Sequence, residues 1–285
     1  MNFFKKISKN KPYFIAEIGI NHNGDIQTAL KLIEAAKLAR CDAVKFQKRT
    51  PEICVPKNQW NIIRDTPWGK MKYIDYKKKM EFNFTQFKKI QNFAKKLKIE
   101  MIASCWDIPS VHFMKKLNIK FYKIASACLT DLKLLKEIKK IKKPIILSTG
   151  MSTQDQIKKS VKILGTKNLC IMHCTSSYPA RNDELNLNYI KKLNKMYLNA
   201  VIGYSGHEVN LSSTIAAFVL GARIIERHIT LDRSMWGTDQ KSSIEPLGLA
   251  RLIRDLEIVQ KSLGDGVKKV YKTELPILEK LRIVK

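Results

Sequence analysis

Short, almost continuously apolar runs alternate along the chain with longer amphipathic stretches. The apolar runs are rich in β-branched residues, as expected for parallel strands that are covered on both faces. We predict eight such strands, at residues 13–20, 42–47, 100–105, 121–127, 144–149, 169–174, 200–205 and 223–229. Apolar residues recur with helical spacing in the stretches that follow, which predicts helices near residues 25–39, 84–98, 108–117, 131–141, 153–164, 185–196, 211–220 and 246–262.

A strand followed by a helix, eight times in succession, is the pattern of a (β/α)8 TIM barrel. We therefore predict an α/β protein in which residues 1–285 form a single barrel domain. The alternative, a doubly wound open sheet, normally carries a Gly-rich G-x-G-x-x-G turn. The sequence contains no such turn, and this favours the barrel.

One connection in this pattern is unusually long. Residues 48–82 separate the second predicted strand from its helix, and connections of this length in compact domains are usually functional. This segment contains two Trp, two Tyr and three Pro, which is too aromatic for a disordered linker. We expect an ordered loop over the mouth of the barrel.

Composition excludes a membrane protein and indicates a reduced, globular one. The chain has 285 residues, of which 45% are hydrophobic, but no apolar run approaches the roughly 18–20 residues of a membrane span. The N-terminal stretch is basic and lacks the apolar core of a signal peptide. The six cysteines form no C-x-x-C pair, so we expect free thiols. These features predict a cytoplasmic protein.

The formal net charge of +28 raises the question of nucleic-acid binding. The excess comes from 43 Lys against ten Arg, and the lysines are spread over the predicted helices. Surfaces that read nucleic acid usually use more Arg and interleaved aromatic residues. We therefore predict a Lys-rich solvated exterior and no nucleic-acid partner. The positive field would still favour small anionic substrates.

Polar residues gather at the carboxyl ends of the predicted strands, where barrel enzymes place their active sites. Residues two apart on a strand face the same side. Three pairs can therefore point into the barrel together: Lys45 with Gln47, Ser205 with His207, and Glu226 with His228.

His207 and His228 end adjacent strands of the predicted barrel. Neighbouring strands lie about 4.7–4.9 Å apart, so the two side chains could share one divalent ion. A site with two histidines leaves positions open for water and substrate oxygens, as a catalytic metal requires. The alternative is a pair of hydrogen-bonded histidines at the rim.

Two inward lysines suggest an anionic ligand, because a lysine inside a barrel is costly unless it is paired. Lys45 and Lys123 are accompanied by strand-end hydroxyls that suit phosphate and carboxylate oxygens. These hydroxyls belong to Ser104, Ser126, Ser148 and Ser205. Each serine alone could equally cap a strand end. Lys123 and Ser126 differ in parity, so both can face the ligand only if a bulge or twist follows Lys123.

A series of motifs resembles the sialic acid (nonulosonic acid) synthase family. The matching stretches are FIAEIGINHNGD, DAVKFQ, KIAS, PIILSTGMST, IMHCTSSYP, GYSGH, ERHITLDR, GTDQ and SIEP, in order from about residue 13 to 270. The resemblance implies a (β/α)8 transferase that condenses phosphoenolpyruvate with an N-acetylated hexosamine such as N-acetylmannosamine and releases phosphate. It also implies a divalent ion, Mn or Mg, and a homodimer.

The same resemblance suggests roles for individual residues. The two metal ligands would be His207 and His228. The catalytic residues, near the sugar or the reacting carbons, would be Glu17, Gln47 and Asp239. The substrate-binding residues would be Lys45, Ser104, Lys123, Ser126, Ser148, Ser176, Tyr178 and Ser205.

The sequence departs from the family pattern at three points. An acidic residue after the fourth-strand serine is replaced by Ala127-Cys128, and the usual Asn of the sixth-strand loop is Ser176. No segment matches the antifreeze-like domain of the best-studied members, whose Arg reaches the partner's sugar. Candidate replacements for that contact are Arg64, Trp68, Arg181 and Arg233. These departures leave two alternatives open: a synthase of another 3-deoxy-ulosonate, and a non-catalytic sugar-binding barrel.

Overall fold

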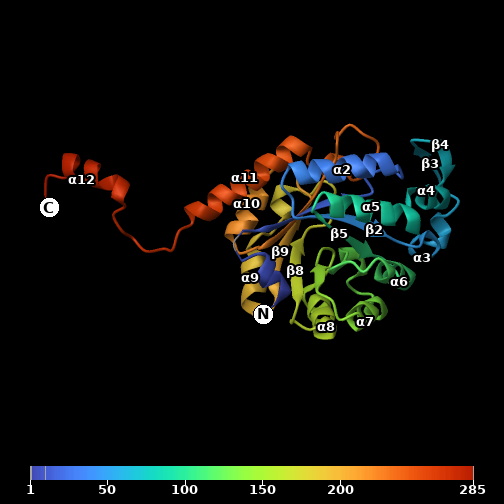
Figure 1. Cartoon of the computed structure of the whole chain (residues 1–285). Helices are drawn as coiled ribbons and strands as arrows, with labels where there is room; N and C mark the ends of the chain where they lie inside the picture. The colour runs from blue at the N-terminus through green and yellow to red at the C-terminus, as the bar shows by residue number, and fades with distance from the viewer. Residues whose placement is uncertain (1, 10, 285) are drawn as a thin grey trace.

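The computed structural model describes residues 2–9 and 11–284 of the chain. Within them, eight parallel strands close into a barrel in the order β1-β10-β9-β8-β7-β6-β5-β2 (Figure 1). The predicted barrel is therefore confirmed. Its strands are β1 (Tyr13–Gly19), β2 (Ala43–Lys48), β5 (Glu100–Cys105), β6 (Tyr122–Ile124), β7 (Ile145–Ser148), β8 (Leu169–Cys174), β9 (Val201–Gly206) and β10 (Ile224–His228).

The helices that cover the barrel also lie where the apolar spacing predicts them. They are α2 (Ile26–Leu38), α5 (Phe84–Lys96), α6 (Ile108–Lys116), α7 (Leu132–Lys140), α8 (Gln154–Leu164), α9 (Asn188–Met196), α10 (Ser212–Val219) and α11 (Pro246–Ser262). Several begin at polar residues that accept backbone N–H bonds: Asp25, Asn83, Asp107, Asp131 and Thr153. Each such cap stabilises its helix by about 1 kcal/mol.

The amino-terminal end of the barrel is closed by a short helix that the apolar pattern did not predict. This helix, α1 (Phe3–Ile7), inserts Phe4 among buried residues at the barrel floor. The Phe4 ring lies 5.6 Å from that of Phe121 in an edge-to-face contact. A helix of five residues is too short to show a clear periodicity, so only its tertiary contacts reveal it.

Arg227 is a charged residue of β10 whose contacts are structural. Its neighbours on β10, Glu226 and His228, point into the barrel, so Arg227 points outward. There it is fully buried and pairs with Glu208 at 3.0 Å, and it also donates to the hydroxyl of Thr214 on α10. At the end of β10, Glu226 and His228 thus face the barrel interior, and Arg227 faces the surrounding helices.

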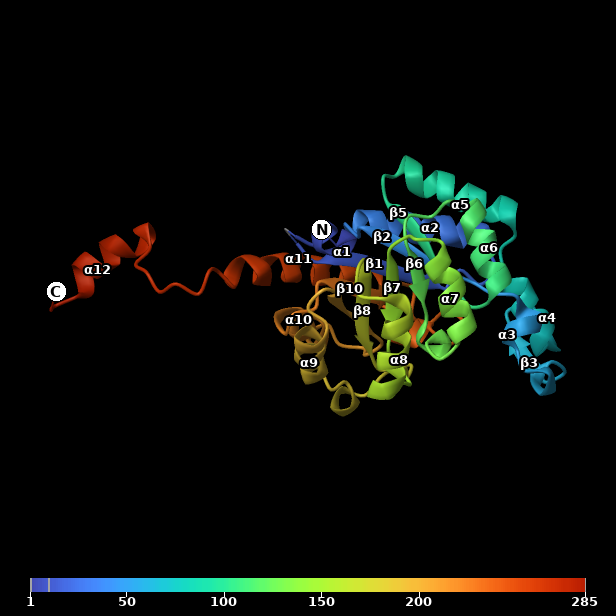
Figure 2. The ribbon, with the colours of Figure 1, turned by 90° about the horizontal axis from the view of Figure 1, so that it is seen from below.

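The long segment 48–82 is ordered and carries its own secondary structure. It contains α3 (Pro51–Cys54), the 3₁₀ turn η1 (Lys57–Gln59), a hairpin of β3 (Ile63–Thr66) and β4 (Gly69–Lys72), and α4 (Tyr73–Met80). Figures 1 and 2 both place these elements at one end of the barrel, beyond the end of β2.

A second connection, after β10, meets this segment through Trp236, whose ring lies 5.3 Å from that of Tyr76 in an edge-to-face contact. The two connections together cover part of the mouth.

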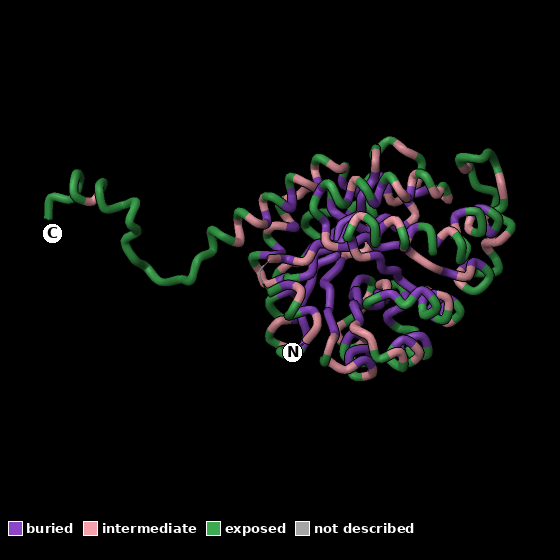
Figure 3. Tube along the Cα trace, viewed as in Figure 1, coloured by how far each residue is buried: buried purple, intermediate pink, exposed green. Residues whose placement is uncertain are grey.

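The chain leaves the barrel after α11. Its last elements, η5 (Lys272–Glu274) and α12 (Leu275–Leu281), extend away from the end opposite the mouth and are almost entirely exposed (Figures 1 and 3). The strands, by contrast, form the buried centre of the molecule (Figure 3). Among the helices that the structure describes, none combines the length and the apolar character that a bilayer crossing requires.

His22, in the loop after β1, predicts acid sensitivity of the fold. The ring is 3% exposed, stacks 4.2 Å from Phe82, and accepts a hydrogen bond from the Gly24 N–H. Burial, and next the charge of Arg49, lower the pKa of His22 to about 3. The unfolded chain protonates this residue below pH 6.5, whereas the folded chain does not. The stabilisation is therefore complete above pH 6.5 and is lost as the pH falls towards 3.

We expect this residue to lower the free energy of unfolding by about 2 kcal/mol between pH 7 and pH 5. Urea unfolding at several pH values measures this slope. The variant His22→Phe should flatten it by the same amount, whatever its stability at pH 7. An unchanged slope in the variant would contradict the assignment.

Candidate active site

A cavity of about 170 Å³ opens at the carboxyl ends of the barrel strands. Twelve of the thirteen residues to which the family resemblance assigns a role line it: Glu17, Lys45, Gln47, Ser104, Lys123, Ser126, Ser148, Ser176, Tyr178, Ser205, His207 and His228. The thirteenth, Asp239, lies beside it, with Oδ2 3.7 Å from Nδ1 of His228. The structure therefore brings these thirteen residues together, whereas Arg64, Trp68, Arg181 and Arg233 do not line the cavity.

Strand register explains this convergence. In the ladders, Glu17 is level with Lys45 on one side and with His228 on the other. Ser104 is level with Lys123, and Ser205 is level with Glu226. Inward side chains at one level of a closed barrel form a layer. The parity difference between Lys123 and Ser126 is resolved by β6 ending at Ile124, after which a 3₁₀ turn, η2 (Ser126–Cys128), begins.

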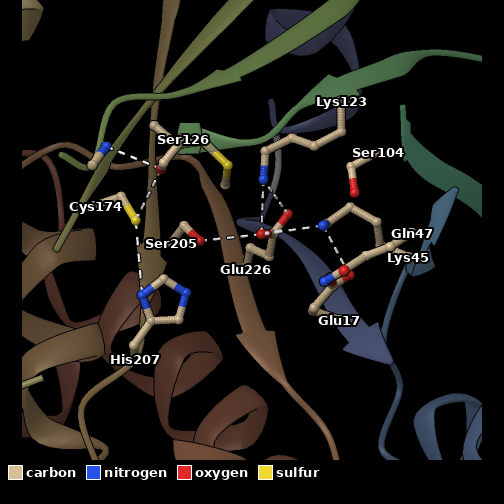
Figure 4. Close-up of polar contacts among 12 residues, drawn as sticks. Glu17, Lys45, Gln47, Ser104, Lys123, Ser126, Cys174, Ser205, His207 and Glu226 are labelled. Atoms are coloured by element: carbon tan, nitrogen blue, oxygen red, sulfur yellow. Dashed lines mark hydrogen bonds and ion pairs between the residues drawn. The ribbon is translucent and has the colours of Figure 1, made fainter. Parts of the chain in front are cut away.

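Four buried charges form the base of the cavity (Figure 4). Both carboxylate oxygens of Glu226 accept hydrogen bonds of 2.8 Å from Nζ of Lys123. Glu226 also accepts a bond of 3.1 Å from the Ser205 hydroxyl and lies 3.7 Å from Nζ of Lys45. Lys45 in turn contacts Glu17 at 2.9 Å. The two positive and two negative charges balance one another out of contact with bulk water.

The positions of the charges set their protonation. Burial alone would lower the pKa of Lys45, but Glu17 and Glu226 outweigh it and raise the pKa. Lys123 has one carboxylate partner and is repelled by Lys45, so burial prevails and its pKa falls. Burial would raise the pKa of Glu226, but Lys123 and Lys45 outweigh it and lower the pKa to about 2. Burial raises the pKa of Glu17, which also faces Glu226. Glu17 therefore takes up a proton more readily than Glu226.

The two histidines are poised side by side at the rim of the cavity, with ring centroids 5.4 Å apart. Nδ1 of His207 lies 2.7 Å from the carbonyl oxygen of Thr175, to which it can donate, leaving Nε2 with a free lone pair. Nδ1 of His228 is buried without a hydrogen-bond partner, and burial lowers the pKa of this ring to about 3. Burial would lower the pKa of His207, but Cys174 outweighs it and raises the pKa. Nε2 of His207 and Nδ1 of His228 would bind a divalent ion when their rings are neutral.

No three His, Cys, Asp or Glu side chains within the described residues converge as a complete metal cage. The two histidines, with Asp239 next to His228, fit an ion whose remaining positions are filled by water or substrate. The Tyr178 ring packs 4.2 Å from His207 and 5.8 Å from His228, and this contact limits the movement of both rings.

Hydroxyls line the wall between the lysines and the histidines. The Ser126 hydroxyl accepts a bond of 3.0 Å from the Gly150 N–H, and the buried hydroxyl of Ser148 has no partner. An unpartnered buried hydroxyl is costly, so a ligand oxygen at this wall would satisfy it. A side chain on Gly150 would come within 2.1 Å of the Ser176 oxygen, so this glycine keeps the wall open.

Six lining residues had not been assigned a role from the sequence, and three of them carry polar or reactive groups: Glu226, Trp106 and Cys174. Parity had already placed Glu226 with His228 inside the barrel, but it did not give Glu226 a role. Trp106 directly follows β5, two residues beyond Ser104, so the same rule applies. Cys174 lies 3.8 Å from Nδ1 of His207, and only the fold reveals that proximity. Burial would raise the pKa of this thiol, but His207 outweighs it and lowers the pKa to about 7.

Comparison with known proteins gives a consistent result. The sequence model of the NeuB family matches residues 32–268. Mouse N-acetylneuraminate-9-phosphate synthase is 36% identical over 277 residues, which cover 96% of this chain and 77% of the mouse protein. N,N'-diacetyllegionaminic acid synthase of Campylobacter jejuni is 37% identical over 271 residues, 93% and 81% of the two chains.

The solved structures agree with the sequence matches. The N-acetylneuraminic acid synthetase of Leptospira borgpetersenii, solved in complex with citrate, superposes with a TM-score of 0.84 at 31% identity. The match covers 95% of this chain and 91% of that chain. The similarity therefore includes the whole barrel.

The charge cluster predicts a large effect of Glu226→Ala on stability. This change leaves Lys123 buried without a carboxylate in contact, so we expect the free energy of unfolding to fall by about 3–5 kcal/mol. Urea unfolding at pH 7 measures the loss. Glu52→Ala is the matched control, because its ion pair with Lys78 is about half exposed and should contribute less than about 1 kcal/mol. Equal losses in the two variants would refute the prediction.

Proposed function

The chain belongs to the NeuB family, and we propose that it is a synthase that condenses phosphoenolpyruvate with an N-acetylated hexosamine to give a sialic-acid-like nonulosonate and inorganic phosphate. One observation of the site carries this proposal: a buried pair of lysines and a wall of hydroxyls lie beside two histidines in a single cavity. The first half suits a small polyanion, and the second suits a metal-bound carbonyl. A non-catalytic sugar-binding barrel would need neither.

Phosphoenolpyruvate fits the lysine half of the site. Lys45 and Lys123 would offset the negative charge of its carboxylate and phosphate, and the Ser104, Ser148 and Ser205 hydroxyls would donate to its oxygens. Without substrate, Glu226 pairs with Lys123 and Glu17 pairs with Lys45. The bound anion would then contact the same lysines as these carboxylates. The carboxylates already fix the orientation of the lysine side chains.

The histidine half would hold the divalent ion, Mn or Mg, through His207 and His228. When bound, such an ion polarises a carbonyl oxygen and so makes the aldehyde carbon of the open-chain sugar more electrophilic. Asp239, beside His228, is suited to accept hydrogen bonds from the sugar hydroxyls. Gln47 donates to Glu17 at 3.0 Å and so orients it towards the centre of the cavity.

The reaction forms one carbon–carbon bond. Carbon 3 of phosphoenolpyruvate attacks the aldehyde carbon, whose oxygen takes up a proton. Water then adds to carbon 2, and the tetrahedral intermediate expels inorganic phosphate by cleavage of its bond to the phosphate oxygen, which leaves a 2-keto acid. Glu17, whose pKa is raised, is the carboxyl group best placed to exchange a proton with this water.

The product class follows from carbon count and from the relatives. Phosphoenolpyruvate contributes three carbons and a hexosamine six, which gives a nine-carbon acid. The relatives include synthases of a 9-phosphate and of legionaminic acid, at 36% and 37% identity, so overall identity does not distinguish a phosphorylated sugar from a free one. Following the family resemblance, we also propose a homodimer, and a cytoplasmic location because phosphoenolpyruvate is a cytoplasmic metabolite.

Purified protein with phosphoenolpyruvate, Mn²⁺ and N-acetylhexosamines, free or 6-phosphorylated, should release inorganic phosphate. His207→Ala and His228→Ala should abolish phosphate release while circular dichroism shows an intact fold, because either change removes half of the metal site. Chelation of the metal should have the same effect on the unaltered protein.

Two results would overturn the proposal. Release with a phosphorylated pentose but with no N-acetylhexosamine would indicate a synthase of a shorter 3-deoxy-ulosonate. No release with any sugar, together with no binding of a divalent ion, would indicate a barrel without catalytic activity.

Lys123→Ala should act mainly on phosphoenolpyruvate binding. Loss of a charged contact in a buried site costs about 1.5–3 kcal/mol, so we expect the KM for phosphoenolpyruvate to rise about ten- to hundredfold and the KM for the sugar to change little. Steady-state kinetics with each substrate varied in turn measures both constants. An unchanged KM for phosphoenolpyruvate would refute this role.

A further inference from the structure

A second group of cations lies above the cavity and takes no part in the proposed site for phosphoenolpyruvate. Arg49 follows β2 and shares the parity of Lys45 and Gln47, so it continues the inward-facing row to the mouth. Its side chain is 11% exposed and its guanidinium carbon lies 4.4 Å from the centre of the Trp106 ring. Trp106 itself lines the cavity.

Arg49 and Trp106 both have hydrogen-bonding capacity that the protein leaves unused. Nε of Arg49 and Nε1 of Trp106 are buried without a hydrogen-bond partner. The nearest carboxylate oxygen to Nε of Arg49, on Glu81, is 3.6 Å away, and Glu81 is held more closely by Lys48 at 2.7 Å. Buried donors without acceptors are rare and costly. Two of them beside a substrate cavity indicate a ligand with acceptor oxygens.

Helix α4 adds a second cation. Lys77 is half-buried, and within the described part of the chain its ammonium has no carboxylate or hydrogen-bond partner. It lies instead 5.1 Å and 5.2 Å from the ring centres of Tyr73 and Tyr76. The guanidinium of Arg64, on β3, lies 5.3 Å from the Tyr73 ring. Contacts with aromatic faces offset only part of the cost of burying a charge.

The connection that carries Asp239 links the helix of Lys77 to the histidines. Tyr76 contacts Trp236, which precedes Asp239 by three residues, and Asp239 contacts His228. Burial, and next the charge of Arg49, lower the pKa of Lys77 to about 8, while Asp239 acts in the opposite direction. The charges of both Arg49 and Asp239 therefore act on the Lys77 ammonium. A sugar whose aldehyde faces the histidines and whose hydroxyls face Asp239 would direct its other end at this group.

We propose that Arg49 and Lys77, with Arg64 beside them, bind a phosphate monoester on the end of the sugar farthest from its aldehyde, which rests on the function proposed above. The substrate is then an N-acetylhexosamine 6-phosphate and the product a nonulosonate 9-phosphate, since phosphoenolpyruvate supplies the first three carbons. A phosphate monoester carries a charge of about −1.5 to −2 and three acceptor oxygens. It matches a guanidinium fork and an ammonium group, whereas a neutral hydroxyl would leave the charges uncompensated.

The test compares two sugars on matched variants. At saturating phosphoenolpyruvate, kcat/KM is measured for N-acetylmannosamine and its 6-phosphate. We expect the unaltered enzyme to prefer the phosphorylated sugar by about a hundredfold or more, and Lys77→Gln to lower this ratio about ten- to hundredfold. Arg49→Gln should act in the same direction. Lys78→Gln, the control on the same helix, removes a lysine that pairs with Glu52 at the surface and should leave the ratio unchanged.

Three outcomes would overturn the phosphate site. These are equal kcat/KM for the two sugars in the unaltered enzyme, equal effects of Lys77→Gln and Lys78→Gln, and a rise in the KM for phosphoenolpyruvate in place of that for the sugar phosphate. Efficient turnover of the free sugar alone would refute the site and leave the proposed function intact.

A binding measurement separates the phosphate site from turnover. Calorimetric titration with N-acetylmannosaminitol 6-phosphate, which has no aldehyde and cannot react, should show binding that Lys77→Gln weakens at least tenfold and Lys78→Gln does not. If neither sugar is turned over, the proposed function fails, and this titration still supports or refutes the phosphate site.

Discussion

The buried cluster of Lys45, Lys123, Glu17 and Glu226 is the constraint on which the rest of the site depends. Four charges inside a barrel are tolerated only when each has a partner at short range, and here the partners come from four different strands. The barrel must therefore close with this register for the charges to be compensated. The cost of a misplaced strand is high, and the lysines are consequently held in position before any substrate binds.

The segments above this layer make the rim of the cavity chemically different from its base. The lysines lie at its base, the histidines at its rim, and Asp239 beside them. The contact between Tyr76 and Trp236 joins the two covering connections. A substrate entering from this side would meet Arg49 and Lys77 before the deeper pair. There are thus two separate positive regions, one formed by Lys45 and Lys123 and the other by Arg49 and Lys77, as two anionic reactants would require.

Much of the site follows from strand parity alone. The period of two paired Lys45 with Gln47, Ser205 with His207, and Glu226 with His228, although it gave Glu226 no role. Parity fails where a strand ends early: Ser126 reaches the cavity through a 3₁₀ turn. It also cannot reveal Lys77, because the position of this residue over the mouth depends on how α4 packs against another loop, through contacts between residues far apart in the sequence.

The sequence by itself determined the barrel, its eight strands and helices, and the set of side chains at the strand ends, because these depend on local periodicity and on the rule that parallel strands end at one edge. Only the tertiary structure decided which charges pair, since Glu226 lies 103 residues from Lys123 along the chain. It also placed α1 under the barrel and Arg49 over Trp106. These contacts arise from closure of the sheet and from the packing of its connections, which no local pattern encodes.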